Sequence, residues 1–333
     1  MRFLFMRNLV LGLVLGLGAS VANAEFSFAL IGDQEYDASQ EAMFPNLRDD
    51  INKDKSVRFV INDGDIKGGS VPCTDELYAT RLGEYNLFRA PFIYIVGDNE
   101  WTDCHRPKAG GYQPLERLAK VRSVFHNFNS PSLGLRPLTL TRQSPQYPEN
   151  VRWNYAKVQF VGLNVPGSNN GLSATTNNKY DAENLAEYKI RNAANISWLK
   201  EAFAEAKSKN MIGLMMVIQA NMWDAIPSTE LTGFQEFIKV IADETKAFGK
   251  PVILVNGDSH YFRIDKPLPT LPFDPKLAFQ PGTWESPEPR LKNFTRVETF
   301  GTVNSDWIKV TVDPKDPSVF TFRQRIVSAN TSK

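Results

Sequence analysis

Residues 59–65 read Phe-Val-Ile-Asn-Asp-Gly-Asp, a short apolar run that ends in a turn carrying two carboxylates. Three further stretches repeat the arrangement: Phe-Ala-Leu-Ile-Gly-Asp-Gln-Glu at 28–35, Phe-Ile-Tyr-Ile-Val-Gly-Asp-Asn-Glu at 92–100, and Val-Ile-Leu-Val-Asn-Gly-Asp-Ser-His at 252–260. A β-branched apolar run closed by a glycine turn predicts a buried strand. Because open α/β sheets bind ligands at the carboxyl ends of their strands, these four ends predict one acidic cluster that holds metal.

Helical patterns separate the first three strands. Pro45 is predicted to open a helix whose buried face carries Phe44, Leu47 and Ile51. Thr74 is the predicted N-cap of a second helix, which has acidic residues in its first turn. The order strand, helix, strand, helix, strand predicts a layered and mostly parallel α/β architecture.

The remaining pattern is mixed. Helices are predicted at 115–125, after an N-cap at Asn195, and at 234–248. Strands are predicted at 151–155, 158–164, 212–218, 252–255, 295–300, 307–312 and 319–323. The segments at 129–150, 166–181 and 266–289 are rich in turn residues and are predicted to be loops.

The first 24 residues have the pattern of a signal peptide. Arg2 and Arg7 precede an apolar run from Leu9 to Gly18, and a small-x-small site ends at Ala24. The alternative, a membrane anchor, is disfavoured because spanning a bilayer needs about 20 apolar residues. We therefore predict cleavage after Ala24, a periplasmic or secreted protein, and a single domain at 25–333.

Charge and cysteine content narrow the class of protein further. The chain has 38 basic and 37 acidic residues, and loss of two arginines with residues 1–24 leaves a net charge of −1. Such a balance gives no sign of nucleic-acid or anionic-membrane binding. Export predicts a disulfide between Cys73 and Cys104, with two free thiols as the alternative. If the strands before them are neighbours, this bridge joins two loops of the predicted site.

The order of motifs resembles the calcineurin-like metallophosphoesterases. That family has Asp-x-His, Gly-Asp, Gly-Asn-His-Asp/Glu, a lone His and Gly-His-x-His, each after a strand. The resemblance covers almost all of residues 25–333 and implies a four-layer α/β/β/α sandwich of two mixed sheets. It also implies two metals at the strand ends.

Matching the motifs residue by residue carries the family roles onto this chain only in part. Asp33 and Asp65 match the first Asp and the bridging Asp, and His260 matches the final His. Glu35, Gln219 and Asp258 stand where the family has histidines, and Asp98 stands where it has the ligating Asn. Asn99 replaces the proton-donating His, and Glu100 matches the end of its motif.

Every lost ligand is thus replaced by an oxygen donor. The resemblance implies one metal held by Asp33, Glu35, Asp65 and His260, and a second held by Asp65, Asp98, Gln219 and Asp258. Such oxygen-rich sets favour two divalent cations such as Mg²⁺, Mn²⁺ or Ca²⁺ over Zn²⁺ or Fe.

The implied reaction is hydrolysis at phosphorus in a phosphorylated small molecule or polymer. Asn99 is a poor proton donor, so Glu100 or His105 is the candidate acid, and we favour His105 because imidazole titrates near neutrality. Lys67 and Arg106 are the candidate substrate-binding cations because they lie close to the motifs.

Other interpretations of the same residues remain open. His105, Lys67 and Arg106 also fit solvated loop positions, Gln219 fits an ordinary strand end, and Asp-Gly pairs are common in turns. The whole chain also fits a catalytically silent relative that uses the site for structural cation or ligand binding. An unrelated two-lobed binding protein is a third alternative, but no hinge pattern is visible in the sequence.

Overall fold

A computed structural model describes residues 24–172, 181–223, 232–270 and 289–331. Residues 1–23 of the predicted signal peptide and most of the predicted loop at 266–289 lie outside these residues, as do 173–180 of the loop at 166–181. No helix in the part of the chain that the structure describes is long and apolar enough to cross a bilayer.

The first sheet contains five strands in the order β12-β11-β1-β2-β3. β1, β2 and β3 run parallel to one another, and β11 and β12 add antiparallel neighbours on the far side of β1. The strands are β1 (Phe26–Ile31), β2 (Val57–Asn62), β3 (Phe92–Tyr94), β11 (Trp307–Val312) and β12 (Phe320–Arg325).

The second sheet contains seven strands in the order β4-β5-β6-β7-β8-β10-β9. Its centre, β6-β7-β8-β10, is parallel, whereas β4, β5 and β9 pair antiparallel at its two sides. The strands are β4 (Thr141–Ser144), β5 (Tyr147–Tyr155), β6 (Val158–Gly162), β7 (Gly213–Val217), β8 (Val252–Asn256), β9 (Arg263–Asp265) and β10 (Phe294–Glu298).

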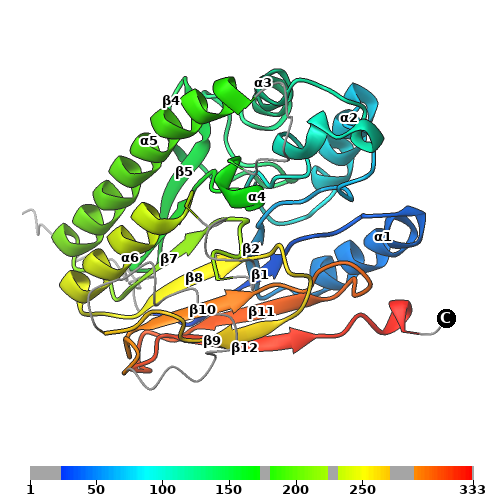
Figure 1. The fold of residues 1–333 in the computed structure, drawn as a ribbon. Helices are drawn as coiled ribbons and strands as arrows, with labels where there is room; N and C mark the ends of the chain where they lie inside the picture. Colours follow the sequence, from blue (N-terminus) through cyan, green and yellow to red (C-terminus); the bar gives the residue numbers. More distant parts are fainter. Residues whose placement is uncertain (1–23, 173–180, 224–231, 271–288, 332–333) are drawn as a thin grey trace, which may run out of the picture.

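The two sheets lie between two layers of helices (Figure 1). Helices α1 (Ala38–Lys53), α2 (Asp75–Tyr85) and α3 (Pro114–Phe125) contribute to the core on one outer side. Helices α5 (Asp181–Ser208) and α6 (Gln235–Phe248) contribute to the core on the other, and α4 (Gly167–Asn170) is one short turn. The fold is the predicted four-layer α/β/β/α sandwich of two mixed sheets.

Aromatic packing fills the space between the sheets. Phe28 and Phe59 from the first sheet stack at 4.7 Å, and both meet Phe160 of the second sheet edge-on, at 5.5 and 5.3 Å. All three side chains are fully buried. Apolar residues that face inward from both sheets hold the strands, and therefore the loops that follow them, in fixed positions.

Two predicted helix starts are wrong. Helix α1 begins at Ala38, where Asp37 accepts a hydrogen bond from the Gln40 amide at 2.9 Å, and Pro45 lies inside it. Proline removes one backbone hydrogen bond and its ring crowds the carbonyl of residue 41, a cost that burial of the apolar face of this helix offsets. Thr74, by contrast, caps α2 as predicted, with its side chain accepting from the Leu77 amide at 3.2 Å.

Helix α5 begins well before Asn195, the predicted N-cap. The buried Asn195 side chain instead donates to the Asn164 carbonyl at 2.8 Å and accepts from Asn150 at 2.7 Å. One turn earlier, the buried Arg191 bonds the Asn170 carbonyl at 3.0 Å. The first half of α5 therefore uses polar tertiary contacts, which give no apolar periodicity. The predicted loop at 129–150 likewise contains β4 and the start of β5.

Candidate metal centre

Three side chains from three strand-end loops converge at the carboxyl edge of the sheets. Asp33 follows β1, Asp65 follows β2 and His260 follows β8, and one donor atom from each lies within 4.8 Å of the others. Both carboxylates are buried, and His260 is partly exposed. His260 Nε2 lies 3.7 Å from Asp33 Oδ1. The apolar-run pattern thus correctly predicted that these residues meet.

The Tyr36 hydroxyl lies at the centre of this group, and sequence reasoning missed it. Tyr36 Oη donates to Asp65 Oδ2 at 2.5 Å and lies 3.2 Å from Asp33 Oδ1. It also lies 3.1 Å from His260 Nε2 and accepts from Asn99 Nδ2 at 2.9 Å. Its place three residues after Asp33, in the same turn, was the only available signal.

The backbone at the site takes a left-handed conformation at five non-glycine residues. The φ angles are 51° at Asp33, 63° at Glu35, 53° at Asp65, 81° at Asp258 and 65° at His260. Residues other than glycine rarely adopt this backbone conformation, and those that do are concentrated at functional sites.

Two glycines allow the loops to approach each other closely. A Cβ on Gly97 would lie 2.2 Å from Asp65 Oδ1, and one on Gly257 would lie 2.2 Å from Asp33 Oδ2. Any larger residue at either position would displace a carboxylate of the group. The glycines in the motifs are therefore needed for space as well as for turning.

Burial dominates the protonation of the group. It raises the pKa of the Asp33 carboxyl, and the negative charges of Asp63 and Asp258 raise it further. Burial also raises the pKa of Asp65 and lowers that of His260. A bound cation would favour the ionised carboxylates and the neutral imidazole, the forms that bind metal. Two carboxylates and an imidazole therefore fit a divalent cation, with Asp33, Asp65 and His260 as its holders.

Three members of the second predicted ligand group, Asp98, Gln219 and Asp258, are neighbours, and the Gln219 carboxamide lies between the two carboxylates. Gln219, which follows β7, donates from Nε2 to Asp98 Oδ1 at 3.2 Å and to Asp258 Oδ1 at 3.3 Å. Its Oε1 accepts a hydrogen bond from the Gly167 amide at 2.5 Å. The three residues are thus neighbours, joined through the nitrogen of the amide.

Glu35 does not join Asp33, Asp65 and His260. Its side chain is buried against Arg81, with Oε1 2.9 Å from Arg81 Nη1. The same guanidinium donates to the Ile66 carbonyl at 2.8 Å and to the Glu41 carboxylate at 2.6 Å. Arg81 of α2 therefore ties the turn after β1 to the turn after β2. Burial raises the pKa of Glu35, and Arg81 opposes that rise.

Glu100 and Asn99 both contact the loop that carries Asp65. The buried Glu100 Oε1 accepts from the Tyr94 hydroxyl and the Gly97 amide, both at 2.6 Å, and from the Asp65 amide at 3.2 Å. Asn99 donates from Nδ2 to Asp65 Oδ2 at 2.8 Å and from its backbone to Asp65 Oδ1 at 3.1 Å. Glu100 fixes the loops, and Asn99 touches the group itself.

The remaining predicted site residues lie around this edge. His105 Nδ1 is 2.7 Å from the Thr102 carbonyl, so this nitrogen carries the hydrogen. Arg106 pairs with Asp103 at 2.7 Å and is partly exposed. Lys67 is fully buried, and its ammonium makes one hydrogen bond among the described residues, to the Gly68 carbonyl at 3.2 Å.

Cys73 and Cys104 form the predicted disulfide. Cys104 lies in the short 3₁₀ helix after the third motif, and Cys73 immediately precedes the N-cap of α2. Both sulfur atoms lie close to the Asn99 carbonyl oxygen, at 3.5 and 3.6 Å. The bridge therefore joins the loop after β2 to the loop that carries Asn99.

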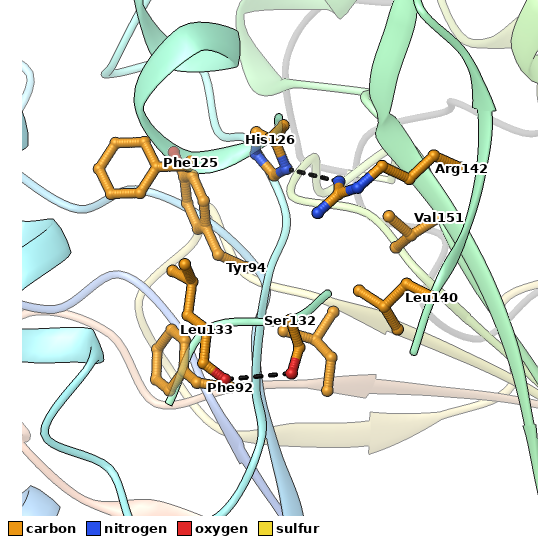
Figure 2. A pocket seen from close by; sticks show the side chains of 10 residues that line it. Phe92, Tyr94, Phe125, His126, Ser132, Leu133, Leu140, Arg142 and Val151 are labelled. Atoms are coloured by element: carbon orange, nitrogen blue, oxygen red, sulfur yellow. Dashed lines mark hydrogen bonds between the residues drawn. The ribbon is translucent and has the colours of Figure 1, made fainter. Parts of the chain in front are cut away.

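A small cavity lies away from this site, between β3 and β5 (Figure 2). His126 lines it, stacked on Tyr94 at 5.2 Å and with Nδ1 3.5 Å from Arg142 Nη1. Burial and the charges of Arg142 and Arg122 hold the pKa of His126 well below its usual range. None of the predicted site residues lines this cavity.

No protein-family model and no curated protein sequence matches the chain. Solved structures do. The purple acid phosphatase PPD1 from yellow lupin seeds is 10% identical, with a TM-score of 0.52, over 92% of this chain and 52% of the plant protein. The chain thus spans about half the length of that phosphatase. GAP50, described as the anchor in the inner membrane complex of Plasmodium, is 12% identical over 91% of this chain and 89% of its own, with a TM-score of 0.45.

The likeness to the purple acid phosphatase concerns the fold. Together with the sheet order and the helical layers, it shows that the chain has the calcineurin-like phosphoesterase fold. In this fold class the group of Asp33, Asp65 and His260 is a candidate metal centre.

Proposed function

We propose that this protein hydrolyses phosphate esters or phosphoanhydrides with a divalent cation held by Asp33, Asp65 and His260. The observation that carries the proposal is the convergence of these three side chains at the carboxyl edge of a calcineurin-like fold. A cation bound there would supply charge for a phosphoryl oxygen and a water of lowered pKa. The oxygen-rich group favours Mg²⁺, Mn²⁺ or Ca²⁺ over Zn²⁺ or Fe.

The resemblance to the family predicts two divalent cations, with Glu35 a ligand of the first. The proposed reaction needs only the cation at Asp33, Asp65 and His260. Asp65, Asp98, Gln219 and Asp258 would hold the second, but the hydrogen bonds of Gln219 to Asp98 and Asp258 favour a structural role for the amide. Glu35 remains a predicted ligand whose present partner is Arg81.

Substrate binding is proposed for the two cations near Asn99. Arg106 is partly exposed and reaches Ser168 Oγ at 3.5 Å, beside the carboxylates, which suits contact with a phosphoryl oxygen. Lys67 is fully buried near Glu100 and Asp65, and its ammonium makes one hydrogen bond among the described residues, so its charge acts from the protein interior. The substrate class is a phosphorylated small molecule or polymer.

Leaving-group protonation is proposed for His105. Because its Nδ1–H donates to the Thr102 carbonyl, Nε2 is the atom that would carry the transferable proton. Glu100 is held by three donors and serves to position Asp65, whereas Asn99 orients the Asp65 carboxylate. His105→Ala should slow hydrolysis of esters with poor leaving groups most. Undiminished turnover of such an ester would reject His105 as the acid.

The experiment is metal-dependent turnover by the purified protein. After chelator treatment, Mg²⁺, Mn²⁺, Ca²⁺ or Zn²⁺ is added back singly with a monoester, a diester and an anhydride. Turnover should return with Mn²⁺ or Mg²⁺ and be lost in Asp65→Asn, while Asp243→Asn, in an exposed pair on α6, keeps it. Equal turnover by Asp65→Asn and the unchanged protein would reject the proposal.

A second candidate function is a silent binding module. The observation that favours it is that protein donors already satisfy the carboxylates: Tyr36 and Asn99 bond Asp65, and Gln219 bonds Asp98 and Asp258. Cation-dependent melting without turnover on any ester would select this reading.

Export to the periplasm or the exterior is also part of the proposal. The N-terminal pattern and the disulfide support it, because disulfides persist in oxidising compartments. Sequencing the N-terminus of the exported protein should give Glu25 as the first residue. A protein that keeps residues 1–24 would overturn the predicted cleavage.

A further inference from the structure

We infer that this site takes one divalent cation per chain, and that the Gln219 carboxamide occupies the place of a second. The inference rests on the proposed cation site at Asp33, Asp65 and His260, and it goes beyond the proposed function by fixing the stoichiometry. Four features of the second group carry it.

The first is the orientation of the amide. Gln219 is fully buried, and its Oε1 accepts a hydrogen bond from the Gly167 amide at 2.5 Å. Turning the amide over would set an N–H group against the N–H of Gly167, so the oxygen stays on that side. Gln219 therefore faces the carboxylates with its nitrogen, which cannot ligate a cation.

The second is what the nitrogen does. Nε2 has two hydrogens, and it bonds Asp98 Oδ1 at 3.2 Å and Asp258 Oδ1 at 3.3 Å. It thus joins two carboxylates from different sheets, as a bridging cation would, with hydrogen bonds instead of ligand bonds. Asp98 Oδ2 accepts from Ser168 at 2.9 Å, and Asp258 Oδ2 accepts from the Asn221 amide at 2.9 Å.

The third is the lack of space beside these carboxylates. A Cβ on Gly167 would lie 2.7 Å from Asp258 Oδ1 and 2.8 Å from Asp98 Oδ2. The backbone of α4 is therefore packed directly against both side chains. A cation at these carboxylates would therefore have to take the place of the amide.

The fourth is that protein donors already bond both oxygens of Asp65, the predicted bridging ligand. Its Oδ2 faces Tyr36, but its Oδ1 accepts the backbone N–H of Asn99 at 3.1 Å. In the first group, by contrast, Asp33, Asp65 and His260 all point toward the hydroxyl of Tyr36. The central contact of the first group is thus a side-chain hydroxyl, whereas the backbone of Gly167 packs against the carboxylates of the second.

The test is the number of cations bound. The full protein is stripped with chelator and titrated with Mn²⁺ by calorimetry, and bound manganese is counted by elemental analysis after desalting. We expect one equivalent, which is lost in Asp65→Asn. Gln219→Ala should keep one equivalent, and Gln219→Glu, which replaces the donor with a third carboxylate, should take up a second.

Two equivalents in the unchanged protein, with one lost in Gln219→Ala, would overturn the inference. The Gln219→Ala measurement decides even if Gln219→Glu fails to fold. The count does not depend on turnover. One equivalent without hydrolysis rejects the proposed function alone, two equivalents with hydrolysis reject this inference alone, and no binding rejects both.

Discussion

The ion pair between Arg81 and Glu35 can be tested by removing each partner in turn. Arg81→Met leaves the Glu35 carboxylate buried without its counter-ion. No other group compensates, because the Glu35 oxygens accept no hydrogen bond among the described residues. Glu35→Gln leaves Arg81 with four further acceptors: the Ile66 carbonyl, the backbone carbonyl of residue 35, Glu41 and Glu84. The two substitutions should therefore have unequal effects.

The magnitudes follow from what each variant leaves behind. Removing one partner of a buried ion pair leaves the other charge buried and unpaired, which destabilises a protein by about 3–5 kcal/mol. We expect this loss for Arg81→Met. Glu35→Gln loses one charged contact, about 1.5–3 kcal/mol. In the Glu35→Gln background, Arg81→Met should cost only about 2 kcal/mol, from the hydrogen bonds to the Ile66 and Glu35 carbonyls.

The sign of the pH dependence gives a second readout. Burial raises the pKa of Glu35 in the folded protein above its value in the unfolded chain. At a pH above the ordinary pKa of a glutamate, folding is therefore coupled to proton uptake, and stability falls as the pH rises. Without Arg81 that effect grows, and the deficit of Arg81→Met should be larger at pH 8 than at pH 5. Arg48→Met, in a pair with the exposed Asp49, is the control and should change stability by at most about 1 kcal/mol.

The assay is urea denaturation of the four proteins of the cycle, with Mn²⁺ affinity measured on each. We expect Glu35→Gln to keep its Mn²⁺ affinity. If Glu35→Gln weakens Mn²⁺ binding tenfold or more, while Arg81→Met stays within about 1 kcal/mol of the unchanged protein, the ion-pair assignment is wrong and Glu35 is a metal ligand.

Tyr36→Phe should destabilise the cation-free protein by about 1–3 kcal/mol through its lost hydrogen bonds. Mn²⁺ should then raise the melting temperature of this variant more than that of the unchanged protein, and equal shifts would contradict the prediction. Replacing Cys73 and Cys104 with serine should lower the free energy of unfolding, measured in urea, by about 3–4 kcal/mol, because the bridge closes a loop with a sequence separation of 31. A loss below about 1 kcal/mol would refute this prediction. The depressed pKa of His126 means that the unfolded chain takes up its proton first, so stability should fall as pH drops below about 6.5, by at most about 1.4 kcal/mol per pH unit. His126→Phe keeps the stack on Tyr94 and should flatten this fall, whereas parallel pH curves for the two proteins would count against it.

The sequence was sufficient for the buried central strands and for the edge at which they end, but not for β4 or β9 at the margins of the second sheet. Apolar runs such as 59–61 are buried on both faces of a layered fold, so composition and glycine turns locate them without knowledge of partners. Asp33, Asp65 and His260 were predicted to meet for the same reason, since each lies in the turn after a buried strand.

The direction of each side chain could not be predicted in the same way. Glu35 lies only two residues after Asp33, but its carboxylate lies against Arg81 of α2 and not beside Asp33. The left-handed φ angles of both residues turn the chain there, and the sequence does not reveal them. Tyr36 was missed because its place three residues after Asp33 was the only signal, and an aromatic residue there usually belongs to the core. Gln219 was predicted at the right place, but only the Gly167 amide reveals which end of its side chain faces the carboxylates.

The left-handed residues at the site also determine which replacements are informative. Alanine at Asp33, Asp65 or Asp258 would remove the carboxylate and also place an ordinary Cβ-bearing residue in a conformation that disfavours it by about 1–2 kcal/mol. Asparagine tolerates that conformation, and glycine adopts it freely. A paired Asn and Gly scan of these positions would separate the contribution of the carboxylates from that of the backbone, which an alanine scan would combine.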